Sequence, residues 1–217
     1  MLLIESDLAL LYYLAKLLEA VVEETGIYTP TGIIEEFDRT VHEELDFRNE
    51  ARNAAAGRKA RIIARMNALL EPEIIAALYA ASQAGVTIDL IVRGVCSLRP
   101  GLPGVSDNIR VRSVLGRFLE HSRVFYFHND GAEDVYLSSA DWMDRNFFRR
   151  IEICFPVLEP RLKKRVIREG LTTLLSRDAE AWEMDAAGDY RLHKGKRGRS
   201  GHPQTVILDL LTGKPAR

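Results

Sequence analysis

The fold is decided by residues 61–92, RIIARMNALLEPEIIAALYAASQAGVTIDLIV. Residues 61–66 and 86–92 match the pattern of short buried strands, and the second run is rich in branched side chains. Between them, Pro72 begins a stretch with apolar residues at helical spacing, and Gly85 ends it. A strand, a helix and a strand at this spacing predict a βαβ unit, whose parallel sheet needs helices on its faces. The sequence therefore predicts an α/β fold.

The residues after this unit extend the sheet. Further strand patterns occur at residues 109–114, 124–128, 135–138 and 151–155, and residues 159–175 predict a helix. The loop from Arg93 to Asn108 is rich in glycine and proline, so it is long, constrained and more than a linker. Residues 185–217 are expected to form a basic, flexible tail.

Upstream of residue 54 the chain has a different character. Apolar residues recur at helical spacing over residues 8–24 and 33–53, which predicts an N-terminal helical hairpin. Residues 1–56 carry 12 acidic and 4 basic side chains, whereas residues 57–217 carry 19 acidic and 26 basic, and 20 of these 26 are arginine. This break predicts two segments of different origin, residues 1–53 and 54–184, ahead of the tail.

The composition excludes several classes of protein. Hydrophobic residues make up 47% of the chain and charged residues 28%, which is typical of a globular protein. No apolar run approaches the roughly 18 residues of a membrane span, and the N-terminus does not match a secretory signal. Cys96 and Cys154 have no zinc-binding spacing and are expected to be reduced core thiols of a cytoplasmic protein. The arginine-rich part suits a polyanionic partner, with a solvated basic surface as the alternative.

Candidate site residues follow or precede the predicted strands. Ligands of α/β sheets bind beyond the carboxyl ends of the strands, and Arg93 comes directly after the strand VTIDLIV. His121 and Arg123 lie two residues apart before the next strand but one, so they share a side. The segment VYLSSADWMDRN then adds hydroxyl, acidic and basic groups in Ser138, Ser139, Asp141 and Arg145.

A histidine and several arginines at converging strand ends predict a phosphoryl-transfer site. The histidine would exchange the proton or the phosphoryl group, and the arginines would neutralise charge on the phosphate oxygens. The alternative is structural, with Arg93 as an isolated structural arginine after a strand and His121 as a hydrogen-bonded core residue. The remaining histidines have no metal-ligand spacing, and the sequence lacks a Walker A loop, a GxSxG elbow and a GxGxxG motif. No metal site is expected within the chain.

Residues 53–190 resemble the C-terminal domain of polyphosphate kinase. The resemblance is carried by long matching words, among them IDLIVRG (88–94), LRPG (98–101), FLEHSR (118–123) and SSADWM (138–143). It implies a phospholipase D-like mixed sheet flanked by helices. It also implies an enzyme that moves the terminal phosphate of ATP, reversibly and with Mg²⁺, onto a polyphosphate chain.

The same resemblance assigns expected functions to individual residues. Arg93 matches a phosphate-contacting arginine, and His121 matches a histidine needed for activity. Arg123, Ser138, Ser139 and Asp141 occupy the positions of the HxK and GSxN elements of the phospholipase D superfamily. The lysine of that pattern is Arg123 here, and His128 stands where an acid is expected. In this family the histidine that becomes phosphorylated lies in a preceding domain, which the 52 residues upstream do not contain.

The upstream segment resembles a different family, the UbiB-type atypical kinases. Residues 7–54 are similar to a helical stretch of that family, chiefly through ELDFRNEARNA (44–54). Glu44 and Asp46 match its ExD motif, whose glutamate pairs with a nucleotide-binding lysine. The chain has no strand that bears such a lysine, so a structural role is expected for Glu44.

These observations leave two main functional hypotheses and a third, that the fusion is a chimeric product without a selected function. The first is a polyphosphate kinase domain that transfers phosphate between ATP and polyphosphate, alone or with a complementing subunit. The second is a binding module that holds polyphosphate or nucleotide through Arg93, Arg123 and His121 without turnover. Expected partners are polyphosphate and ATP or ADP, without nucleic acid, and self-association through the N-terminal helices is expected. The expected location is the cytoplasm, with peripheral association with the inner membrane as an alternative.

Overall fold

The computed structural model describes residues 47–195 and 202–213. The chain divides into two compact units, Met1–Asp46 and Phe47–Arg217. The expected helix over residues 8–24, most of the helix over residues 33–53, and Glu44 therefore lie outside the described residues. Within the second unit, one eight-stranded sheet organises the fold.

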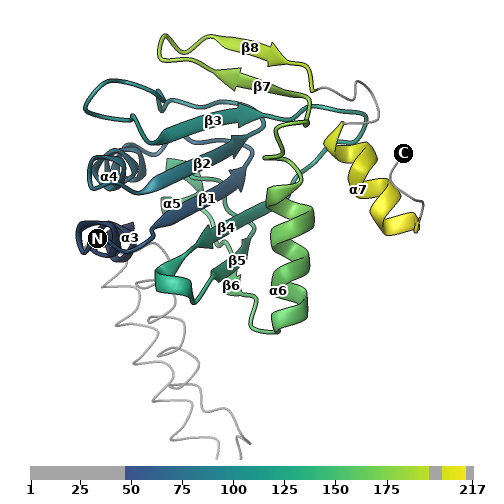
Figure 1. The fold of residues 1–217 in the computed structure, drawn as a ribbon, viewed down its shortest axis with the longest axis horizontal. Coiled ribbons are helices and arrows are strands. Elements are labelled where there is room, and N and C mark those ends of the chain that lie inside the picture. Colours follow the sequence, from purple (N-terminus) through teal and green to yellow (C-terminus); the bar gives the residue numbers. More distant parts are fainter. Residues whose placement is uncertain (1–46, 196–201, 214–217) are drawn as a thin grey trace, which may run out of the picture. The chain divides into compact units, whose positions relative to one another are not determined.

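The sheet is mixed, with strand order β6-β5-β4-β1-β2-β3-β7-β8 (Figure 1). Strand β1 pairs in parallel with β2, and β2 pairs in parallel with β3, whereas the remaining neighbours are antiparallel. The strands are β1 (Arg61–Met66), β2 (Thr87–Val92), β3 (Ile109–Ser113), β4 (Arg123–Phe127), β5 (Asp134–Ser138), β6 (Cys154–Pro156), β7 (Ala181–Met184) and β8 (Tyr190–His193).

The predicted βαβ unit is confirmed as β1, α4 (Pro72–Gln83) and β2. Glu71 caps α4 by accepting a hydrogen bond from the backbone N–H of Glu73, and Pro72 occupies the first turn, where no N–H is needed. Gly85 has a φ of 96°, which a residue with a Cβ adopts only under strain, and turns the chain into β2.

Helices cover both faces of the sheet. Helices α3 (Phe47–Ala55) and α4 lie on one side, and α6 (Pro160–Val166), which continues as the π-helical segment η2 (Ile167–Thr172), lies on the other (Figure 1). The α3 side holds the aromatic contacts of Trp142 with Phe47 and Phe125. The other side holds an aliphatic cluster that includes Ile63 and Leu171. The expected mixed α/β sheet with flanking helices is confirmed.

Helix α3 crosses the junction expected near residue 54. Its buried Glu50 accepts hydrogen bonds from the backbone N–H groups of Arg61, at 3.0 Å, and of Asn129. The carboxylate therefore ties α3 to the start of β1 and to the 3₁₀ turn η1 (Asn129–Gly131). Because of these contacts the compact α/β unit begins at Phe47, inside the segment that resembles a different family.

The expected flexible tail over residues 185–217 is wrong where the structure describes it. Strand β8 pairs with β7 across a turn in which the side chain of Asp185 accepts two backbone N–H groups. Helix α7 (Pro203–Thr212) is capped at its start by His202, whose side chain accepts from the N–H of Gln204, and at its end by Gly213. Short elements such as these depend on local caps and on neighbouring strands more than on a long apolar pattern. In the described residues no helix is long and apolar enough to cross a bilayer.

Candidate functional site

Four segments converge at one edge of the sheet. Strands β1 and β2 are parallel, so Asn67 and Arg93, which follow them, lie at the same edge. Strand β4 runs antiparallel to β1, and its first residue, Arg123, therefore lies at this edge as well. Asp141 follows β5, whose last residue, Ser138, is opposite Arg123. The ends of these strands thus bring Arg93, Arg123 and Asp141 to one edge of the sheet.

A chain of hydrogen bonds joins these residues. Arg93 donates from Nε to Oδ1 of Asn67 at 2.7 Å, and the backbone N–H of Asn67 donates to Oδ1 of Asp141 at 2.6 Å. Arg123 donates from Nε and Nη2 to the two carboxylate oxygens of Asp141, at 3.2 and 2.9 Å. Nη1 of Arg123 donates to the backbone carbonyl of His121 at 3.0 Å. We call these five residues the strand-edge cluster.

The two arginines of the strand-edge cluster differ in their electrostatics. Arg123 forms a buried ion pair with Asp141, and their side chains are only 10% and 6% exposed, so its charge is compensated. Arg93 is half-buried, and no carboxylate among the described residues pairs with it. Asn67 accepts a hydrogen bond from its Nε, which orients the guanidinium without neutralising its charge. Arg93 is therefore the cation of this edge that is best suited to bind an anion.

Asp141 is held ionised by its partners. Burial would raise the pKa of this carboxyl, but hydrogen bonds from Arg123 and Asn67 and the positive charge of Arg123 lower the pKa below its ordinary value. These donors include two N–H groups that need an acceptor inside the fold. Asp141 therefore anchors the cluster as an anion.

The lowered pKa of Asp141 predicts a loss of stability in acid. A carboxyl with a depressed pKa in the folded state stabilises the fold above the pKa of the unfolded chain, near pH 4, and this stabilisation is lost as the pH falls through the folded value. Urea unfolding of the native chain and of Asp141→Asn should show a stability difference that narrows from pH 6 towards pH 3. A difference that stays constant over this range would contradict the expectation.

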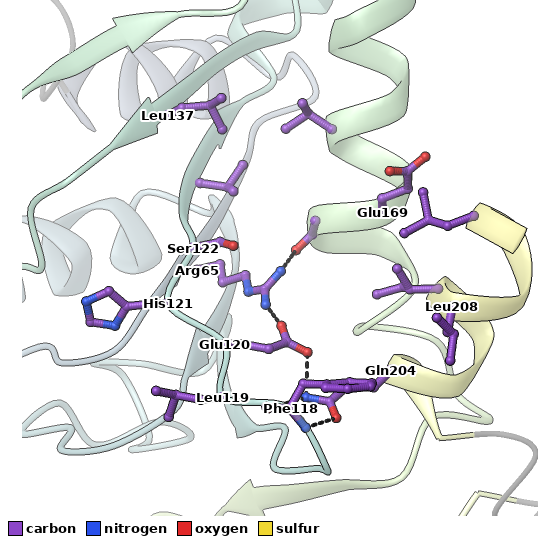
Figure 2. A pocket seen from close by; sticks show the side chains of 15 residues that line it. Arg65, Phe118, Leu119, Glu120, His121, Ser122, Leu137, Glu169, Gln204 and Leu208 are labelled. Carbon is purple, nitrogen blue, oxygen red and sulfur yellow. Dashed lines mark hydrogen bonds and ion pairs between the residues drawn. The ribbon is translucent and has the colours of Figure 1, made fainter.

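His121 is exposed on an irregular loop between β3 and β4. It lies beside an open pocket of about 480 Å³, together with Arg65, Glu120 and residues of α7. In Figure 2 its imidazole lies on the opposite side of the loop from Glu120 and Arg65. The structure thus does not place His121 in the core, which was the structural alternative. Its backbone carbonyl belongs to the strand-edge cluster, whereas its ring is open to solvent.

The other expected residues have structural contacts. Ser138 Oγ accepts the backbone N–H of Ala140 at 3.0 Å, which shapes the turn that leads to Asp141. Ser139 Oγ donates to the carboxylate of Glu152. Arg145 is exposed on the short helix α5 (Asp144–Phe148), outside the hydrogen-bond chain.

His128 is remote from this edge. It follows the other end of β4, and its Nδ1 lies 3.3 Å from the hydroxyl of Tyr126. The position seven residues after His121, where the superfamily pattern has an acid, thus lies at the far end of β4 and holds an imidazole. Within the described residues, no three His, Cys, Asp or Glu side chains are grouped so that they could bind a metal ion.

Two residues of the site were not among the sequence predictions. Asn67 follows β1 directly, so the strand-end argument that selected Arg93 would also have selected it. Glu120 precedes His121 and forms an ion pair with the buried Arg65. Glu120 could not be predicted as a site residue, because its contact with Arg65 of β1 joins residues that are far apart in the sequence.

Known proteins resemble this chain in both sequence and structure. A family model described as polyphosphate kinase C-terminal domain 2 matches residues 30–204. Polyphosphate kinases of Burkholderia multivorans and Paraburkholderia phytofirmans are each 61% identical to the chain over 164 residues. In both cases the match covers 74% of this chain and 24% of the relative. The crystal structure of polyphosphate kinase from Porphyromonas gingivalis is 38% identical, with a TM-score of 0.75, and the match covers 80% of this chain and 27% of that chain.

The matches cover most of this chain but only part of its relatives. The chain spans about a quarter of the length of the curated relatives, for example 24% of the Burkholderia multivorans protein. The family match also begins at residue 30, upstream of the expected junction, and so includes part of the segment that resembles UbiB-type kinases. The strand-edge cluster lies entirely inside the matched range. The chain belongs to the family of polyphosphate kinase C-terminal domains.

Proposed function

We propose that this chain supplies the C-terminal part of a polyphosphate kinase active site, which moves the terminal phosphate of ATP reversibly onto polyphosphate. The observation that carries the proposal is Arg93, oriented by Asn67 at the edge of the sheet and without a carboxylate partner among the described residues. A cation held in this way is suited to the charge that spreads over phosphate oxygens during phosphoryl transfer.

In this proposal Arg93 and His121 meet phosphate, and the other residues of the strand-edge cluster hold these two in place. Arg93 binds phosphate oxygens, because no hydrogen bond from its Nη1 or Nη2 reaches another described residue. His121 acts as an acid, a base or a phosphate ligand from the neighbouring loop. Arg123 and Asp141 act as a buried scaffold that holds the backbone of His121. The direct phosphate contact expected of Arg123 is thus replaced by a positioning task.

In the proposed reaction Mg²⁺ is bound to the phosphates of the nucleotide. The described residues offer no grouped set of ligands for the ion. Mg²⁺ typically keeps several waters and binds the phosphates of a nucleotide together with one or two carboxylates. MgATP is therefore the substrate form that we propose.

A second candidate function is a non-catalytic module that binds polyphosphate or nucleotide. It is favoured by the buried ion pair of Arg123 with Asp141, because this pair leaves only Arg93 and the exposed His121 of the expected site residues at this edge to meet phosphate. Incubation of the purified chain with γ-labelled ATP, magnesium and short polyphosphate distinguishes the two. Labelled polymer supports transfer by this chain, whereas polyphosphate retained on a filter without labelled polymer supports binding alone. If no labelled polymer forms and no polyphosphate is retained on the filter, both candidate functions are wrong.

Replacing His121 with alanine is expected to leave the fold intact and to impair phosphate handling. The imidazole is exposed, so its removal should shift the melting temperature by less than about 2 °C. Turnover, or polyphosphate affinity if the chain only binds, should fall about tenfold or more. His193→Ala is the matched control, because His193 is also exposed but lies on β8. Equal effects of the two substitutions would argue against a functional task for His121.

A further inference from the structure

The loop that carries His121 is held by the C-terminal helix α7. Residues 114–122 form no regular secondary structure, so the backbone groups of this loop need partners other than a strand ladder. Several of these partners come from the segment His202–Gln204, which lies far away in the sequence. Figure 2 shows Gln204 reaching the loop beside Phe118 and Glu120.

The amide of Gln204 makes three hydrogen bonds to the loop. Its Oε1 accepts from the backbone N–H of Phe118 at 2.9 Å, and its Nε2 donates to the carbonyl of Phe118 at 2.7 Å. Nε2 also donates to Oε1 of Glu120 at 2.8 Å. The residue is only 6% exposed, so water cannot easily replace these bonds. Both amide donors and the amide oxygen are thus used on the loop.

Glu120 connects this arrangement to the sheet. Its other carboxylate oxygen forms an ion pair with Arg65 of β1, which also donates to the carbonyl of Gly170 in η2 at 3.1 Å. Arg65 is only 7% exposed and is therefore fixed in place. The loop is clamped between β1 and α7 at the residue next to His121.

The close approach of α7 to the loop depends on Gly116. A Cβ atom at this position would overlap the side chains of His202 and Gln204. His202 Nε2 also lies 2.9 Å from the carbonyl of Leu115. The start of α7 therefore contacts the loop at several residues.

We propose that Gln204 is a positioning residue for His121, acting through its amide bonds to Phe118 and Glu120. Side chains of Glu120 and His121 lie on opposite sides of the loop, so fixing the first orients the second (Figure 2). That this positioning serves phosphate handling rests on the proposed function of His121. Whether Gln204 holds the loop and orients the imidazole of His121 can be measured independently of that function.

The test compares Gln204→Glu with Gln83→Glu in the full chain. The first substitution keeps the size of the side chain and an acceptor for the N–H of Phe118, but it removes both N–H donors and puts a carboxylate beside that of Glu120. Repulsion between the two carboxylates should move the side chain away from the loop and so weaken the bond from Phe118 as well. Gln83 is the matched control, because its Nε2 donates at 3.0 Å to the carbonyl of Gly104 in a different loop. In Gln204→Glu the amide of Phe118 should exchange hydrogen about tenfold faster, and the imidazole signals of His121 should shift. In Gln83→Glu neither should change.

Polyphosphate affinity supplies the functional readout. Gln204→Glu should weaken it about five- to tenfold, and it should cause no further loss in the His121→Ala background. An equal loss in both backgrounds, or unchanged Phe118 exchange and His121 signals, would overturn the inference. If His121→Ala by itself leaves affinity unchanged, the proposed function of His121 fails, while the exchange and imidazole signals still decide the positioning. If Gln204→Glu does not fold, Gln204→Met, which removes the bonds without adding charge, takes its place with the same expected results.

Discussion

Asp141→Ala is expected to lower the free energy of unfolding by about 3 to 5 kcal/mol, the usual cost of removing one member of a buried ion pair. The substitution leaves the guanidinium of Arg123 without its carboxylate in a site where that side chain is only 10% exposed. It also removes the acceptor of the backbone N–H groups of Asn67 and Ala68. Urea unfolding at pH 7 measures the loss.

Two further variants separate the buried charge from other effects. Arg123→Met in the Asp141→Ala background should recover part of the stability, because removing both charges of a buried pair is often close to neutral. Asp144→Ala is the surface control, since its ion pair with Arg149 spans 3.4 Å between side chains that are more than half exposed. That control should cost less than about 1 kcal/mol. A similarly small loss for Asp141→Ala would show that the pair does not hold the strand-edge cluster.

Arg93→Ala should weaken binding of polyphosphate by about 10- to 100-fold. Hydrogen bonds that involve a charged group contribute about 1.5 to 3 kcal/mol, and each 1.4 kcal/mol corresponds to a factor of ten in affinity. Arg93 is expected to make such bonds because its charge has no carboxylate partner among the described residues. Affinity should be measured at two salt concentrations, because polyanion binding is strongly screened.

Arg99→Ala is the matched control for this substitution. Arg99 belongs to the same glycine- and proline-rich loop and is exposed, with its side chain near Gly188 of the β7–β8 turn. The control removes the same charge from the loop and should change affinity less than about twofold. Arg93→Lys should give an intermediate loss, since an ammonium retains the charge but not the planar fork. If Arg99→Ala weakens binding as much as Arg93→Ala, the effect is one of overall charge rather than of a site.

The central part of the fold could be predicted because its pattern is local. Within residues 61–92, two apolar runs flank a stretch with apolar residues at helical spacing. These three segments form β1, α4 and β2 in the structure. Strands β7 and β8 are only four residues long, and their pairing across the turn at Asp185 produces no long apolar run. The start of α7 likewise depends on a capping contact of His202, which residue patterns show only weakly.

The candidate site was predictable where strand ends determine it. Arg93, Arg123 and Asp141 each flank a predicted strand, and the structure joins them through Asn67. The difference between the two arginines could not be predicted, because it depends on which one Asp141 reaches. The clamp by Gln204 also remained hidden, because it joins residues that are more than 80 positions apart.

Chemical-shift mapping with polyphosphate tests the central claim most directly. The isotope-labelled chain is titrated with polyphosphate of defined length, and the backbone and side-chain signals are followed. We expect saturable shifts concentrated at Asn67, Arg93, His121 and Arg123, with small changes on β7 and β8. Shifts confined to the basic helix α6, or no shifts at all, would contradict a phosphate-binding site at this edge of the sheet.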